Sequence, residues 1–153
     1  MEFNIREIEI NDYYKKYFDL LSQLTSADNV DFKDWEKRIQ EIKQNPYHHI
    51  FVIEDKGKII GSATLLIEMK IIRKLSKIGH VEDVVISNKY RGKGLARELI
   101  NHCINFSKNK DCYKLILNCN KDLANFYSKF GFENKNIQMS IYFWYFIYLN
   151  LNQ

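Results

Sequence analysis

Glycine and basic residues alternate in one short stretch of the chain, Arg91-Gly92-Lys93-Gly94. An apolar, β-branched run at 79–87 precedes it and apolar residues at helical spacing follow it, so the stretch is expected to join a strand to a helix. Glycines lack a Cβ, which lets the backbone turn tightly and bring its N–H groups up to phosphate oxygens at the positive end of the helix dipole. The stretch therefore predicts an anion-binding loop, with an ordinary glycine turn as the alternative.

The spacing of these glycines excludes two common nucleotide-binding loops. A P-loop needs Lys and then Ser or Thr after its second glycine, whereas Leu95 follows Gly94. A dinucleotide fingerprint needs a third glycine where Arg97 stands. The remaining pattern, Arg91-x-x-Gly94-x-Ala96, resembles the pyrophosphate loop of the GNAT acetyltransferase superfamily, and this resemblance implies that acetyl-CoA binds there.

Three other side chains have the chemistry to assist acetyl transfer to an amine. The ammonium group must first lose a proton, and Glu82 or Asp83, directly or through water, is the candidate base. Tyr127 could give a proton to the leaving thiolate, and a strand N–H could stabilise the oxyanion. Alternation along a strand places the two acids on opposite faces, so one could be a structural hydrogen-bond partner. For Tyr127, one of ten tyrosines, the alternative is a core aromatic residue.

Composition indicates one globular domain over residues 1–153. Hydrophobic residues make up 46% and charged residues 27% of the chain, and the net charge is +4. The basic residues are scattered, which argues against nucleic acid as a partner and suits an anionic small molecule. The first twenty residues lack the apolar segment of a signal peptide, so the cytosol is the expected compartment.

The cysteines and histidines predict neither disulfides nor a metal site. Cys103, Cys112 and Cys119 are odd in number and form no C-x-x-C pair, and the four histidines lack a metal-binding spacing. The thiols are expected to be free, in a reducing compartment.

Hydrophobic periodicity predicts an α/β fold with a mixed central β-sheet flanked by helices. Asp31 is the expected N-cap of one helix, while Asn120 caps another that Gly131 ends. Asp55–Lys58 should be a hairpin turn with glycine at a positive φ, and Lys70–Lys77 a basic loop. Expected strands cover 3–8, 50–54, 59–68, 79–87 and 113–119, and further helices cover 14–24 and 95–104.

The stretch Ile141–Leu149 consists of nine consecutive apolar or aromatic residues. It is too short to span a bilayer, which needs about 20 residues. It is expected to be a buried or intersubunit strand, because a membrane-surface segment would carry flanking Lys or Arg, which are absent.

The GNAT resemblance extends over about residues 3 to 140. Besides the loop, Asn120 and the helix end Phe126-Tyr127-x-x-Phe130-Gly131-Phe132 follow the superfamily's order and spacing. The resemblance implies the GNAT (acyl-CoA N-acyltransferase) fold, as a single N-acetyltransferase domain over residues 1–153.

Within the superfamily, the chain is similar to the glucosamine-6-phosphate N-acetyltransferase family. The stretches that carry this similarity are Glu68–Arg73, Gly79–Val85, Tyr90–Leu95 and Cys112–Cys119. The similarity implies direct transfer of acetyl from acetyl-CoA, a co-substrate, to D-glucosamine 6-phosphate, giving N-acetyl-D-glucosamine 6-phosphate for UDP-N-acetylglucosamine biosynthesis. It also implies a homodimer with shared active sites.

The same similarity assigns site residues. The catalytic residues would be Tyr127, Glu82 and Asp83. The coenzyme would contact Val84, Val85, Ile86, Arg91, Gly92, Lys93, Gly94, Leu95, Ala96, Arg97, Asn120 and Tyr127. The amino-sugar phosphate would contact Thr25, Lys70, Ile71, Ile72, Arg73, Glu82, Asp83 and Asn118.

Two positions depart from the family's pattern. Asn118 stands where the family has an acid, and it can orient the sugar amine but cannot take its proton. Tyr142 stands where the family has a basic residue that helps to bind the sugar phosphate. One alternative is a GNAT enzyme for another amine, such as a polyamine or a protein N-terminus, although Lys70 and Arg73 favour an anionic acceptor. The other alternative is a catalytically silent acetyl-CoA-binding module.

Overall fold

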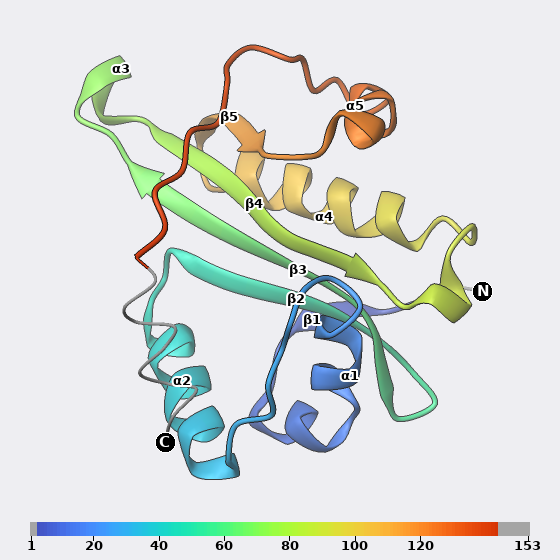
Figure 1. The fold of residues 1–153 in the computed structure, drawn as a ribbon. Helices are drawn as coiled ribbons and strands as arrows, with labels where there is room; N and C mark the ends of the chain where they lie inside the picture. Colours follow the sequence, from blue (N-terminus) through green and yellow to red (C-terminus); the bar gives the residue numbers. More distant parts are fainter. Residues whose placement is uncertain (1–2, 144–153) are drawn as a thin grey trace. The chain divides into compact units, whose positions relative to one another are not determined.

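The computed structural model describes residues 3–143 of the chain. The chain divides into two compact units, residues 1–119 and residues 120–153. The first unit is a β-sheet with helices on both faces, and the second begins with a helix (Figure 1). The single domain expected over residues 1–153 stays a prediction.

Five strands of the described chain form one sheet, in the order β1-β2-β3-β4-β5. Strands β1 to β4 are antiparallel to their neighbours, whereas β4 and β5 are parallel, so the sheet is mixed, as predicted. The parallel pair requires a crossover, which the helix α4 (Leu95–Asn109) provides. The strands are β1 (Ile5–Glu7), β2 (His48–Asp55), β3 (Lys58–Met69), β4 (Lys77–Ile86) and β5 (Cys112–Leu117).

One face of the sheet is covered by the 3-10 helix η1 (Ile10–Tyr14) and the helices α1 (Tyr17–Leu21) and α2 (Phe32–Gln44) (Figure 1). In α2, apolar residues at helical spacing, Phe32, Trp35, Ile39 and Ile42, form a stripe, and Trp35 and Ile39 of this stripe are buried. The helices and strands share one buried cluster on this face, formed by Ile8, Tyr17, Leu20, Trp35, Ile39, Val52, Ile59 and Val85.

The other face of the sheet is covered by α4. The helix buries Leu95, Leu99, Ile100 and Cys103, four residues of its predicted apolar face. Phe51 of β2 lies with its ring centre 4.4 Å from that of His102 in α4. The sheet is thus packed between two helical layers, and these layers fix where β4 and α4 meet.

Local signals at element ends are confirmed. The Asp31 carboxylate accepts the Asp34 N–H at 2.9 Å and caps α2. In the β2–β3 turn, Lys56 and Gly57 have φ values of 48° and 73°, the left-handed pair that a two-residue hairpin needs.

The single helix expected over 14–24 is wrong. The chain forms η1 and then α1, because Lys16 between them has a φ of 64° and breaks the helical run. The apolar residues expected to face the core were Tyr14, Tyr17, Phe18, Leu21 and Leu24. Of these, Tyr17 is buried and Phe18 and Leu21 are half-buried, whereas Tyr14 and Leu24 are exposed. No glycine or proline marks this break in the sequence.

The basic loop between β3 and β4 contains a tight turn, labelled α3 (Ile72–Leu75) in Figure 1. Arg73, Lys74 and Leu75 all have positive φ values, of 56°, 58° and 59°. The turn is therefore left-handed. The Lys70 N–H donates to the Ser76 carbonyl at 2.8 Å and closes the loop's base.

A charged cluster joins β1, η1 and β2 at one end of the first unit. Both Oδ atoms of Asp12, a fully buried side chain, accept hydrogen bonds from the Arg6 guanidinium at 2.7 Å. Glu54 accepts from Arg6 at 2.6 Å and from Lys15 at 2.8 Å. Burial opposes ionisation of Asp12, but the bonds from Arg6 and from the Glu9 N–H outweigh it, so the pKa of Asp12 lies below its ordinary value.

The second unit begins with α5 (Lys121–Ser128), after the expected N-cap Asn120. The Asn120 carbonyl accepts the Leu123 N–H at 2.9 Å, but its side chain makes no capping bond within the described chain. Gly131 was expected to end this helix, but α5 already ends at Ser128 with Lys129 as its C-cap. Gly131, with a φ of 88°, lies in the turn beyond the helix end.

The strand expected at 141–149 falls largely on residues 144–149, which lie outside the described residues. The described part, Ile141, Tyr142 and Phe143, is exposed and belongs to no strand. No helix within residues 3–143 is long and apolar enough to cross a bilayer.

Candidate active site

The strand β4 carries a bulge where the two predicted acids stand. Thr64 of β3 pairs with Glu82 and Ser62 pairs with Val85, so one residue more lies on β4 than on β3 between these pairs. Asp83 takes up the extra length with a φ of 51°. The bulge interrupts the regular strand alternation at Asp83, so the expected placement of Glu82 and Asp83 on opposite faces stays a prediction. Glu82 is half-buried and Asp83 is exposed.

Beyond the bulge, β4 loses its parallel neighbour. Val81 and Leu117 form the last pair between β4 and β5, yet β4 continues to Ile86. Within the described chain, the edge of residues 82–86 that faces away from β3 thus has no strand partner. Backbone N–H groups on such an edge need hydrogen-bond acceptors. This edge contains the predicted coenzyme contacts Val84, Val85 and Ile86.

The chain then turns from β4 into α4 through the predicted anion loop. Gly92 and Gly94 have φ values of 76° and 84°, and Gly94 directly precedes the first residue of α4. A Cβ at either glycine would meet no atom of residues 3–143 within 4 Å apart from its chain neighbours, so the loop is open to one side. The structure therefore places a free helix start at the end of the free strand edge.

Basic side chains flank this loop. Arg91 donates from Nε to the Ile86 carbonyl at 3.3 Å, which holds the loop to the end of β4. The Lys93 ammonium lies 4.7 Å from the centre of the Tyr90 ring, and Tyr90 hydrogen-bonds Asp55. Hydrogen bonding to Asp55 raises the pKa of the Tyr90 hydroxyl. The loop is thus held in place while its glycines stay exposed.

A buried polar pair lies beside the bulge, and the sequence analysis did not identify it. The Tyr17 hydroxyl of α1 and the Ser62 hydroxyl of β3 are 3.2 Å apart, and both residues are buried. Burial raises the pKa of Tyr17 to about 12, and the negative charge of Asp83 adds to the effect. Ser62 pairs with Val85, so this contact supports β4 just past Asp83. In the sequence, Tyr17 shows only as one member of an apolar stripe.

Asn118 lies close to the bulge, because it follows Leu117, the partner of Val81, and is therefore level with Glu82. It belongs to the rim of the β4 edge. Thr25 lies in the connection between α1 and α2 and is exposed, and its predicted contact with the acceptor stays a prediction.

Within one chain, the basic loop does not join this rim. Met69 and Lys77 form the last β3–β4 pair before the loop. Along β4, Glu82 lies five positions beyond Lys77. At about 3.3 Å per residue, the loop base lies roughly 16 Å along the sheet from the acids. The structure thus separates Lys70, Ile71, Ile72 and Arg73 from the other predicted acceptor residues.

The loop residues have partners of their own. Glu68 is ion-paired with Lys70 and accepts a bond from His80 at 2.9 Å. Lys70, followed by His80, lowers the pKa of Glu68. The Arg73 guanidinium carbon lies 5.9 Å from the centre of the Tyr113 ring on β5. The Glu68 carboxylate therefore partly neutralises the charge of Lys70, whereas the Arg73 guanidinium lies beside an aromatic ring.

Asn120 and Tyr127 belong to the second unit. Tyr127 is buried, with ring centres of Phe126 and Phe132 at 5.1 and 6.0 Å. Their predicted contacts with the coenzyme, and the catalytic role of Tyr127, stay predictions.

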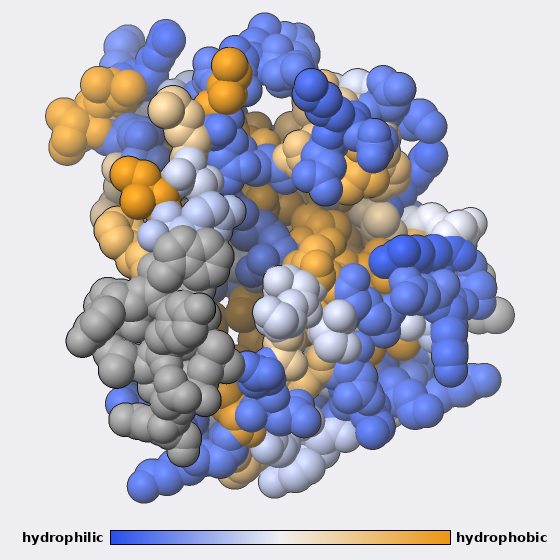
Figure 2. Space-filling model, in the orientation of Figure 1, coloured by the Kyte–Doolittle hydropathy of each residue, from blue (hydrophilic) through white to orange (hydrophobic). Residues whose placement is uncertain are grey.

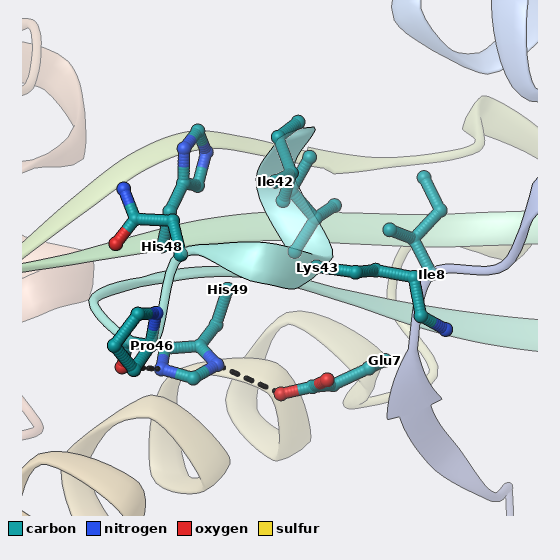
Figure 3. Close-up of a pocket in the computed structure, with 9 residues that line it drawn as sticks. Glu7, Ile8, Ile42, Lys43, Pro46, His48 and His49 are labelled. Atoms are coloured by element: carbon teal, nitrogen blue, oxygen red, sulfur yellow. Dashed lines mark hydrogen bonds and ion pairs between the residues drawn. The ribbon is translucent and has the colours of Figure 1, made fainter. Parts of the chain in front are cut away.

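A small hollow elsewhere in the first unit is structural. It lies between the end of α2 and the start of β2, and none of the predicted site residues lines it. There, His49 has its Nδ1 2.7 Å from Glu7 and its Nε2 3.1 Å from the Pro46 carbonyl (Figure 3). The imidazole thereby joins β1 and β2 to the preceding turn. Among the described residues, no group of His, Cys, Asp and Glu side chains could hold a metal ion.

The strand edge, the bulge and the glycine loop follow one another along the chain. Residues 5–132, which contain all three, match the model of the acetyltransferase (GNAT) family. The chain belongs to this family. It is 38% identical to glucosamine 6-phosphate N-acetyltransferase of Arabidopsis thaliana over 144 residues, covering 92% of this chain and 97% of that protein. It is 38% identical to glucosamine 6-phosphate N-acetyltransferase 1 of Dictyostelium discoideum over 91% of this chain and 90% of that one.

Solved structures of GNAT proteins share the fold. The crystal structure of glucosamine-6-phosphate N-acetyltransferase from Arabidopsis thaliana superposes with a TM-score of 0.90 at 40% identity, covering 94% of this chain and 99% of that one. A Trypanosoma brucei acetyltransferase gives a TM-score of 0.85 at 32% identity, covering 92% and 99%. The predicted family and the predicted fold are confirmed.

Proposed function

We propose that this chain transfers the acetyl group of acetyl-CoA directly to the amine of glucosamine 6-phosphate, giving N-acetylglucosamine 6-phosphate and CoA. The relatives named for this activity cover most of the chain at up to 38% identity. The observation that carries the proposal is the free edge of β4, which runs from Glu82 straight into the glycine loop. This arrangement suits one ligand that has both amide and phosphate groups.

The β4 edge and the loop would hold the coenzyme by backbone groups. Residues 84–86 offer N–H and C=O groups to the amide arm of acetyl-CoA. Gly92 and Gly94 leave room for the pyrophosphate at the start of α4, and Arg91 and Lys93 add charge. The absence of side-chain atoms near both glycines makes the fit possible.

The chemistry is divided between backbone and side chains. A free N–H at the bulge would stabilise the oxyanion formed when the amine attacks the thioester. Glu82 or Asp83 would accept the amine's proton, directly or through water, because Asn118 beside them can only orient the amine. Tyr127 would donate to the leaving thiolate. Holding the two substrates in line would supply much of the rate.

We further propose that the active enzyme is a homodimer in which each copy lends its basic loop to the other's site. The separation of roughly 16 Å along one sheet keeps the loop from its own Glu82. The loop tip also exposes apolar side chains at the surface (Figure 2). Such patches are typical of protein interfaces. The exposed residues are Met69, Ile71, Ile72 and Leu75, at 63%, 85%, 64% and 71% of their accessible surface.

We propose that the protein is located in the cytosol. Cys103, Cys112 and Cys119 are free thiols, one of them exposed, which fits a reducing environment.

Replacing Gly94 by alanine is expected to weaken acetyl-CoA binding about tenfold, the effect of losing one charge-assisted hydrogen bond. Its φ of 84° strains any L-residue, and straightening the backbone would turn an N–H away from the phosphate. Gly57→Ala is the matched control, because Gly57 has a φ of 73° in a remote hairpin. Calorimetry should give a wild-type Kd for the Gly57 variant. An equal loss of affinity in both variants would contradict the loop's role.

Replacing Arg73 by glutamine is expected to lower kcat/KM about tenfold for glucosamine 6-phosphate and less than twofold for unphosphorylated glucosamine. The Arg73 guanidinium forms no ion pair within the described chain, unlike the Lys70 ammonium, and its planar shape suits two bonds to a phosphate. Lys74→Gln is the control, because it removes one charge from the same left-handed turn. If both variants change the substrate preference alike, the effect is one of general charge and the specific phosphate contact is wrong.

The decisive test of the function is release of free thiol from acetyl-CoA with four acceptors: glucosamine 6-phosphate, glucosamine, spermidine and a short peptide. Strong preference for the phosphorylated sugar is expected. Turnover with another amine alone would overturn the substrate and keep the fold. Binding of acetyl-CoA with no turnover on any acceptor would identify a silent binding module.

A further inference from the structure

One side chain links the acceptor side of the site to the coenzyme side. Gln23 follows α1, and its Oε1 accepts the Asn88 N–H at 2.8 Å. Its Nε2 donates to the Asp19 carbonyl at 3.1 Å. An N–H can only donate and a carbonyl can only accept, so these partners fix the orientation of the amide. Gln23 thus bridges two backbone segments far apart in sequence.

The Asn88 end of this bridge belongs to the coenzyme side. Asn88 begins the 3-10 helix η2 (Asn88–Tyr90), which connects β4 to the glycine loop. As a helix start, it has an N–H that needs an acceptor from outside the helix. The Gln23 Oε1 supplies that acceptor, as an N-cap would. A ligand that holds the loop in place therefore also holds one end of the Gln23 bridge.

Gln23 itself lies in the connection between α1 and α2, which also carries Thr25, and its second bond reaches back to Asp19 in α1. The backbone hydrogen bonds of this connection continue the first helix as far as Thr25, whose N–H reaches the Leu21 carbonyl at 3.2 Å. Farther on, the Tyr13 hydroxyl donates to the Val30 carbonyl at 2.8 Å. Residues 22–30 are nearly all exposed. Segments with few buried contacts open locally at low free energy. One additional hydrogen bond, from Gln23 to Asn88, therefore has a noticeable effect on the opening of residues 22–30.

We infer that Gln23 is a positioning residue that transmits coenzyme binding to the acceptor loop. When the loop at 91–97 is held by acetyl-CoA, the Asn88 N–H is held with it, and Gln23 then orders residues 22–30, including Thr25. The inference rests on the proposed function in that it takes acetyl-CoA as the ligand of the loop. It predicts that the coenzyme and the acceptor bind cooperatively, each favouring the other by the same factor.

Two variants of Gln23 separate the bond from the side chain's bulk. Gln23→Met keeps the length and removes both bonds, whereas Gln23→Glu keeps an oxygen that accepts the Asn88 N–H and loses only the bond to the Asp19 carbonyl. Amide hydrogen exchange of residues 22–30 is measured with and without saturating acetyl-CoA. We expect acetyl-CoA to slow exchange about fivefold or more in the wild type and in Gln23→Glu, and not in Gln23→Met.

The possible outcomes test the role of Gln23 separately from the proposed acetyl transfer. Equal slowing in Gln23→Met, or none in a wild type that binds acetyl-CoA, overturns the role of Gln23 and leaves the function standing. Slowing that depends on Gln23, with no turnover of glucosamine 6-phosphate, overturns the acceptor and leaves Gln23 standing. A wild type that fails to bind acetyl-CoA overturns both. In the active enzyme, Gln23→Met should raise KM for the acceptor more than it lowers kcat.

Discussion

Phenylalanine in place of Tyr127 is expected to lower kcat with glucosamine 6-phosphate about 100-fold, the low end for loss of a general acid. The Kd for acetyl-CoA should stay within about twofold of the wild-type value, because the lost proton serves the leaving thiolate and not ground-state binding. The ring contacts with Phe126 and Phe132 need only the aromatic ring, so the substitution keeps these two contacts.

The measurement is thiol release at saturating substrates, together with calorimetric titration of acetyl-CoA. Tyr14→Phe is the control, since Tyr14 is 68% exposed on η1 and lies outside the predicted site. It should match the wild type in both assays. An unchanged kcat in the Tyr127 variant would remove this residue from the mechanism.

Asparagine in place of Asp12 is expected to destabilise the protein by about 3 kcal/mol, because it leaves the Arg6 charge with one partner fewer in a partly buried cluster. The corresponding fall in Tm is roughly 6 to 12 °C. Asp19→Asn is the control, because Asp19 forms an exposed ion pair with Lys16 and such pairs contribute at most about 1 kcal/mol. Thermal and urea unfolding at pH 7 compare the variants.

The loss of stability caused by Asp12→Asn is also expected to depend on pH. The pKa of Asp12 is lower in the folded than in the unfolded chain, so the ionised form stabilises the fold at neutral pH. This contribution is lost as pH falls from about 4 through the lowered pKa. The stability difference between the wild type and Asp12→Asn should therefore shrink in acid. A difference that stays constant down to pH 2 would assign the stabilisation to packing.

Much of the fold follows from local chemistry in the sequence. The Asp31 cap, the Lys56-Gly57 turn and the Gly94 helix start each have a residue type that suits its backbone geometry. Strands with β-branched runs were placed to within a few residues. These features depend on interactions over a few positions, which a single sequence displays directly.

The features that were missed depend on contacts across the sheet or on unusual backbone angles. The bulge at Asp83 interrupts a continuous strand pattern and uses a residue that is not glycine. Lys16 breaks the first helix in the same way. The Tyr17–Ser62 pair and the Gln23–Asn88 bond join residues 45 and 65 positions apart, and neither partner stands out by type.

The candidate site residues were predicted from family resemblance more than from spacing. Glu82, Asp83 and Asn118 come together at the end of β4–β5 pairing, which the parallel crossover determines. Lys70 and Arg73 were grouped with them in the sequence, but one chain places the loop far along the sheet. Only the register of β3 and β4 reveals that separation.

The left-handed turn at Arg73, Lys74 and Leu75 has a consequence for protein engineering. Glycine adopts these angles without strain, whereas each L-residue costs roughly 1 to 2 kcal/mol, or roughly 3 to 6 kcal/mol for three. That sum reaches the lower end of the net stability of a domain, about 5 to 15 kcal/mol. An engineer who relaxes the turn with glycine should therefore gain stability and lose two positive charges and an exposed apolar side chain.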